Sequence, residues 1–175
     1  MKTKRLGRVG AAFTIFLGTL LHFTYEWSGA NKLVGLFSAV NESTWEHLKL
    51  LCVPMLLFAF LEALVYGKQC TNFIPARLVS ILAGMAVIVV TFYTYTGIFG
   101  THFFLADIAI FLLGVIVSYR VGDFFLCHTT LFTSKRAAFL GWFGYGVLWF
   151  LFFLFTFCPP HIPLFQDPVT MRYGV

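Results

Sequence analysis

The chain has 175 residues, of which 59% are hydrophobic and only 11% are charged, and its mean hydropathy is +0.87. Soluble domains average about 45–50% apolar and about 25% charged residues, so this composition excludes an ordinary soluble domain and indicates an integral membrane protein in contact with the lipid bilayer. The net charge of +5 does not indicate nucleic-acid binding, because the basic residues lie at the ends of apolar runs, where they set membrane topology.

Five apolar runs are long enough to cross a membrane as helices. The predicted helices span about residues 9–27, 44–66, 75–95, 102–119 and 137–157, and an irregular tail follows over residues 158–175. A basic start followed by an apolar run also occurs in cleaved signal peptides. The length of the first run, with His22 and Glu26 inside it, favours an uncleaved helix instead. The sequence therefore predicts an all-α polytopic bundle that forms one integral membrane domain over residues 1–175.

The basic residues predict the orientation of the five helices. Nine of them fall on the side that holds the N-terminus, and three fall on the other side, namely Lys32, Lys49 and Arg172. Cytoplasmic loops carry the excess of Lys and Arg. We therefore expect the N-terminus in the cytoplasm and the C-terminus outside.

The segment Asn41–Lys49 is unusually polar for this chain. It carries Glu42, Glu46, His47 and Lys49 directly before a long apolar run. Ser43 and Glu46 have the spacing of a capping box, in which the Ser side chain accepts from the third helical amide and the Glu side chain bonds back to the cap amide. Part of this polarity is thus explained by a helix start.

The polar residues of this segment and of the neighbouring helices are predicted to meet at the outer end of the bundle. An ionised side chain at such depth is costly unless it faces protein or water, so these groups should turn inward. We expect one outward-facing pocket that binds a small molecule or a cation, formed by His22, Glu26, Glu42, Glu46, His47, Lys49 and Asp107. His161 and Asp167 in the tail are candidates for a lid over it. The cytoplasmic half offers only Glu62, Asp123 and His128, which argues against a continuous route for an ion or a solute.

Imidazole and carboxylate ligands suit zinc or a similar divalent metal. His22, Glu26, Glu46 and His47 are the candidate ligands, although adjacent Glu46 and His47 point about 100° apart on a helix and should not bind the same ion. Such a metal can activate water, so a metal-dependent hydrolase acting near the outer leaflet is an alternative function. A structural or partner-binding subunit is another, in which Lys49 reaches the headgroups or pairs with Glu26.

The segments His22–Gly29, Leu36–Lys49 and Pro159–Pro168 carry the patterns HFxYEW, NESTWEHLK and PPxxPLFxDP. In these patterns the chain resembles a family of small bacterial membrane proteins that is known only as a domain of unknown function. The resemblance covers nearly the whole chain. It implies a multi-pass protein of the bacterial cytoplasmic membrane and supplies no activity.

Overall fold

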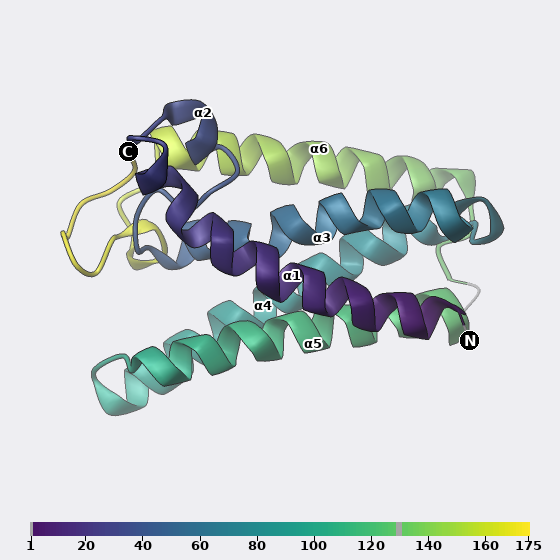
Figure 1. The fold of residues 1–175 in the computed structure, drawn as a ribbon, viewed down its shortest axis with the longest axis horizontal. Coiled ribbons are helices and arrows are strands. Elements are labelled where there is room, and N and C mark those ends of the chain that lie inside the picture. Colours follow the sequence, from purple (N-terminus) through teal and green to yellow (C-terminus); the bar gives the residue numbers. More distant parts are fainter. Residues whose placement is uncertain (1, 129–130) are drawn as a thin grey trace.

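The computed structural model describes residues 2–128 and 131–175. Five long helices run roughly side by side: α1 (Lys2–Trp27), α3 (Thr44–Tyr66), α4 (Phe73–Phe99), α5 (Phe104–His128) and α6 (Lys135–Phe157) (Figure 1). Each is long and apolar enough to cross a membrane. A short helix α2 (Lys32–Gly35) and the 3₁₀ turns η1 (Gly67–Gln69) and η2 (Pro163–Phe165) complete the chain. The predicted all-α bundle with five membrane-spanning helices is confirmed.

Helix α3 has the predicted ends, whereas the other four long helices differ from the prediction at one or both ends. Helix α4 begins before residue 75 and ends after residue 95, and α5 begins at Phe104 and continues well past residue 119. Helix α6 begins at Lys135 because Ser134 caps it through the Ala137 amide. Apolar runs mark the part of a helix that lies in lipid, whereas the backbone hydrogen bonds continue into the polar flanks. These four helices are therefore longer than their apolar runs.

Helices α3 and α4 form the buried centre of the bundle. Helix α4 packs most extensively on α5, and helix α1 packs most extensively on α3. Helix α6 lies against α4. Apolar side chains such as Leu51, Ile81, Val115 and Phe152 fill the core. Large apolar side chains such as Phe16, Leu64 and Phe104 are exposed on the outside of the bundle. This distribution is the one expected where lipid is the solvent.

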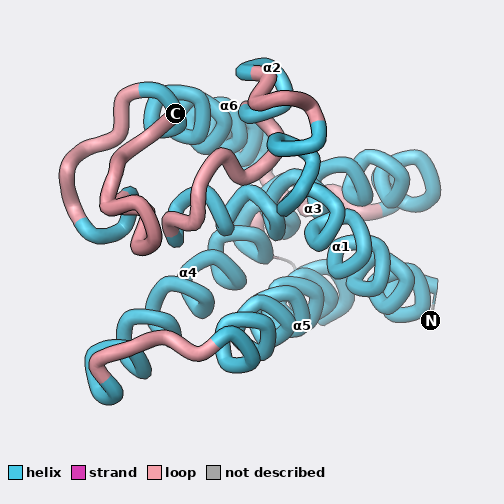
Figure 2. Tube along the Cα trace, turned by 60° about the vertical axis from the view of Figure 1, so that its left-hand side comes forward, coloured by secondary structure: helices cyan, strands magenta, loops and turns pink. Residues whose placement is uncertain are grey.

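The loop between α1 and α3 and the C-terminal tail lie together at one end of the bundle, which we call the tail end (Figures 1 and 2). Helices α1 and α6 end here, and α3 begins. The turn between α4 and α5 projects at the same end but apart from the tail, and both views show this separation. The tail is less irregular than predicted, because it contains η2 and an isolated bridge between Gln166 and Tyr173.

Candidate functional site

The start of α3 organises the tail end. Ser43 is the N-cap, and its hydroxyl accepts from the Glu46 amide at 3.4 Å. The predicted return half of the capping box is wrong. The Glu46 carboxylate accepts from the Val40 amide at 3.0 Å, and the Ser43 amide donates to Asn41 Oδ1 at 2.9 Å. The cap therefore fixes the preceding loop as well as the helix.

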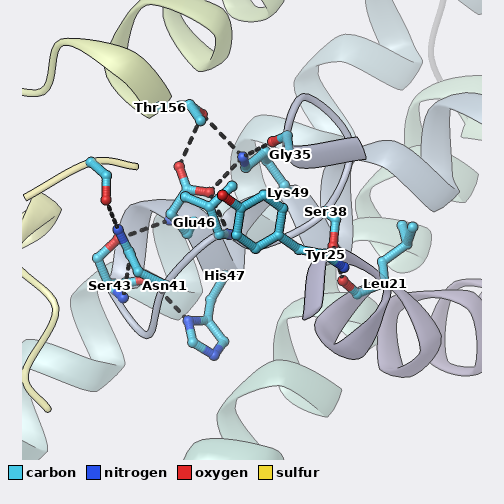
Figure 3. Close-up of polar contacts among 12 residues, drawn as sticks. Leu21, Tyr25, Gly35, Ser38, Asn41, Ser43, Glu46, His47, Lys49 and Thr156 are labelled. Carbon is cyan, nitrogen blue, oxygen red and sulfur yellow. Dashed lines mark hydrogen bonds and ion pairs between the residues drawn. The ribbon is translucent and has the colours of Figure 1, made fainter. Parts of the chain in front are cut away.

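A buried ion pair lies on one side of α3 (Figure 3). Lys49 Nζ is 2.5 Å from Glu46 Oε2, and the two side chains are 0% and 2% exposed. The ammonium group also donates to the Gly35 carbonyl at 2.7 Å and to Thr156 Oγ1 at 3.0 Å, and the Thr156 hydroxyl donates to Glu46 Oε1 at 3.0 Å. Three partners use all three ammonium hydrogens. This group is thus satisfied within the protein, and Lys49 neither reaches the headgroups nor pairs with Glu26.

A second polar group lies on the other side of α3 and contains His22, Glu42 and His47. The Nε2 atoms of the two histidines are 3.3 Å apart. Glu42 Oε2 is 3.4 Å from His47 Nε2 and 3.7 Å from His22 Nε2. Two ligand atoms bound to one zinc ion at about 2.0–2.1 Å in tetrahedral geometry lie about 3.3 Å apart. The three atoms therefore have the mutual spacing of ligands to a single ion.

The imidazole of His47 is held in the tautomer that metal binding requires. Its Nδ1 lies 2.9 Å from the Ser43 carbonyl oxygen. A carbonyl can only accept, so Nδ1 carries the hydrogen and Nε2 presents its lone pair when the ring is neutral. Metal-bound histidines usually donate their second ring nitrogen in this way.

Two contacts, one between the loop and α1 and one between α1 and α3, hold His22 beside His47. The Ser38 hydroxyl from the loop accepts from the Tyr25 amide at 3.1 Å and donates to the Leu21 carbonyl at 2.5 Å, which docks the loop on the last turns of α1. One turn before His22, a Cβ added to Gly18 would lie 2.5 Å from the Leu50 carbonyl oxygen of α3. The backbones of α1 and α3 thus approach closely just below the two histidines.

The group is accessible from outside the protein. The side chains of His22, His47 and Glu42 are 32%, 31% and 46% exposed. In the part of the chain that the structure describes, these three residues are the one set of three His, Cys, Asp or Glu side chains spaced to hold a metal ion. Three protein ligands with a partly open face leave a coordination position for water or another small ligand.

The other predicted site residues lie elsewhere. Glu26 is exposed one turn beyond His22. Asp107 accepts from the Tyr95 hydroxyl and lies 3.1 Å from His102 Nδ1, so it joins α4 to α5 at their separate turn. In the tail, the Asp167 carboxylate accepts from the amide of Val169 and the hydroxyl of Thr170, and the His161 ring lies 4.5 Å from that of Tyr173. The structure thus brings together His22, Glu42 and His47 in one group and Glu46 and Lys49 in another.

A second buried ion pair lies deep in the bundle and was missed by sequence reasoning. Arg77 donates to Glu62 Oε1 at 2.6 Å, and its guanidinium lies 5.7 Å from the centre of the Tyr119 ring. The Tyr119 hydroxyl in turn pairs with Thr14 at 3.0 Å. The available signal was an arginine inside a predicted membrane helix, because such residues face the bundle interior and pair there. Arg77 is one of the nine basic residues that predict the orientation, and it was given no other role.

Comparison with known proteins identifies the family. A profile described as a family of unknown function, DUF6512, matches residues 1–175. No curated protein and no solved structure matches the chain. The resemblance to an uncharacterised family is thereby confirmed, while the bacterial origin stays a prediction. The chain belongs to the DUF6512 family.

Proposed function

We propose that this multi-pass membrane protein binds a divalent transition-metal cation, zinc foremost, through His22 Nε2, Glu42 Oε2 and His47 Nε2. The observation that carries the proposal is the spacing of these atoms, which lie 3.3, 3.4 and 3.7 Å apart although they come from two helices and a loop. Two imidazoles and one carboxylate suit zinc better than magnesium or calcium, which prefer oxygen ligands. The Nδ1 hydrogen bond of His47 to Ser43 supports the same assignment.

The site faces the outside of the cell in the orientation that the basic residues predict. Its ligands come from the last turns of α1, the loop that follows and the first turn of α3, so a cation from the external solution can reach it without crossing the membrane. Glu46 and Lys49 are not part of the ligand set, because each is buried and saturated by other partners. Their role is to hold the surrounding structure.

Metal content of the purified protein tests the proposal. Wild-type protein in detergent, incubated with zinc and desalted, should retain about one zinc per chain by elemental analysis. His22→Ala, Glu42→Gln and His47→Ala should each lose it. In the cobalt-loaded form, the visible absorption bands of a low-coordinate site should disappear in the same three variants.

Two variants serve as matched controls. Glu26→Gln removes an exposed carboxylate one turn from His22, and His102→Ala removes a histidine from the separate α4–α5 turn. Both should retain zinc. Wild-type protein without bound zinc, or equal zinc in all variants, would overturn the proposal. Equal zinc in all variants would show that any bound metal lies elsewhere. Absence of zinc from the wild-type protein would show that the three side chains form only a hydrogen-bonded cluster.

A metal-dependent hydrolase is the second candidate, and the open coordination position favours it. Three protein ligands plus one water is the usual arrangement of catalytic zinc, which lowers the pKa of its bound water to about 7. A bound zinc would supply an activated water for the hydrolysis of an ester or amide at the membrane surface, and His22, Glu42 and His47 would hold the ion. Zinc-loaded protein in liposomes should then cleave a chromogenic ester faster than the Glu42→Gln variant does, and equal rates would exclude this candidate.

A further inference from the structure

The loop that supplies Glu42 is held on several sides by side chains outside the metal-ligand set. Lys49 bonds to the Gly35 carbonyl near its start, and Glu46 bonds to the Val40 amide near its end. Ser38 between them docks on α1. Glu42 is the most exposed of the three proposed ligands, and it is the one that does not lie on a helix. Its position therefore depends on what holds the loop.

A continuous chain of hydrogen bonds joins this loop to the C-terminal tail. Asn41 Nδ2 donates to the Gly174 carbonyl at 3.0 Å, and Asn41 Oδ1 accepts from the Ser43 amide at 2.9 Å. The Ser43 carbonyl in turn accepts from His47 Nδ1 at 2.9 Å. Asn41 and Ser43 are the two neighbours of Glu42. The chain thus runs from the tail past one proposed ligand to a ring nitrogen of another.

The tail itself is firmly placed. Phe165 is buried, and its ring lies 5.1 Å from that of Trp45 and 4.9 Å from that of Phe155. Gly174 has φ +71°, and a Cβ added there would lie 3.1 Å from the Thr156 carbonyl oxygen. The end of the chain therefore lies against α6 at the residue whose hydroxyl completes the Glu46–Lys49 pair.

We infer that Asn41 is a positioning residue for the metal site and that the C-terminal tail, acting through the Gly174 carbonyl, sets the affinity of that site for zinc. The inference rests on the proposed function. Without the Gly174 bond, Asn41 loses its anchor, and the Glu42 carboxylate samples positions outside the reach of the ion. Loss of such an outer contact typically lowers metal affinity about 10- to 100-fold. The tail thereby becomes a means of regulating metal binding, because a partner or protease that displaces it weakens the site.

The test measures zinc affinity in detergent by competition with a chromophoric chelator. Asn41→Asp keeps the acceptor for the Ser43 amide but loses the donor to Gly174. A chain that ends after Tyr173 removes the acceptor instead. Each change should weaken zinc binding about 10- to 100-fold, and the two together should weaken it no further than either alone. A chain that lacks only Val175 keeps the Gly174 oxygen and should bind zinc as the wild type does.

The possible outcomes separate the inference from the proposed function. In the first outcome, the wild type binds zinc, and Asn41→Asp and the chain that ends after Tyr173 bind it with the same affinity. This outcome overturns the inference and leaves the proposed function intact. Fully additive losses also overturn it, because they show that the two changes act by different routes. Helical content and thermal unfolding of the zinc-free variants are measured in parallel, and an affinity loss that follows a loss of fold also counts against the inference. No zinc on the wild type removes the proposed function and the inference with it.

Discussion

Glu46 and His47 are adjacent in the chain, yet their side chains belong to separate polar groups on different sides of α3 (Figure 3). Glu46 forms the buried ion pair with Lys49, whereas His47 lies 3.3 Å from His22. Successive residues on a helix point about 100° apart. A single helical turn can therefore supply one residue to the framework and its neighbour to an exposed site, and this arrangement gives the two groups different responses to mutation.

Removal of one partner of the buried Glu46–Lys49 pair should strongly destabilise the protein. Lys49→Met leaves a buried carboxylate without its counter-charge, and breaking such a pair costs about 3–5 kcal/mol of unfolding free energy. The combined variant Glu46→Gln, Lys49→Met should lose less, because glutamine is neutral and keeps an oxygen for the Val40 amide. Equilibrium unfolding in mixed detergent micelles measures both. A double variant as unstable as the single one would contradict this account, and Glu26→Gln is the exposed control.

Gly18 should be needed for the approach of α1 to α3. In Gly18→Ala the new methyl would lie 2.5 Å from the Leu50 carbonyl oxygen, which is backbone and cannot turn away. We expect a loss of about 1–3 kcal/mol in unfolding free energy and weaker zinc binding, because His22 lies one turn further along α1. Gly146→Ala in α6 is the matched control, since nothing lies within 4 Å of its added Cβ. Equal behaviour of the two variants would refute the close contact.

Zinc binding should weaken as the pH falls. Both histidines must bind the ion as neutral imidazoles, so metal and protons compete for the same nitrogen atoms. The apparent affinity, measured by chelator competition across a series of acidic to neutral buffers, should decrease with acidification and approach a dependence of two protons per ion. An affinity that does not change with pH would show that the histidines are not ligands.

The predicted orientation can be tested with the native cysteines. Cys158 is exposed at the end of α6, and Cys70 is half-buried in the turn between α3 and α4. Variants that retain only one of these two cysteines should differ in intact cells. A membrane-impermeant maleimide should label Cys158 and should label Cys70 only after the membrane is opened. The reverse pattern would place the N-terminus outside and would direct the proposed metal site toward the cytoplasm.

Much of the fold follows from the sequence because lipid imposes simple requirements. Every backbone polar group in the bilayer must be bonded within the chain, so long apolar runs can only be helices, and all five were located. Their ends were less predictable. Arg120 and Asp123 lie beyond the predicted helix over residues 102–119, yet they continue α5. A helix end depends on capping contacts and on neighbouring helices, and hydropathy reports neither.

The candidate site was predicted only in part. His22 and His47 were expected to be close, and Glu42 was placed in the pocket but not among the metal ligands. Glu42 precedes the helix, so no helical periodicity assigns its direction. The loop conformation that brings it to the histidines depends on the docking of Ser38 on α1 and on the hydrogen bond from Asn41 to Gly174, which lies far away in the chain.

The sequence by itself determined the membrane class, the five helices, the Ser43 cap and the concentration of polar residues at one end of the bundle. These features depend on composition and on contacts within a few residues. Only the tertiary structure decided how those polar residues divide. Thr156 of α6 and Gly35 of α2 saturate Lys49 and Glu46, which leaves His22, Glu42 and His47 together on the other side of α3. Local patterns place a side chain on a helix face, but its partner is chosen by whichever distant segment packs against that face.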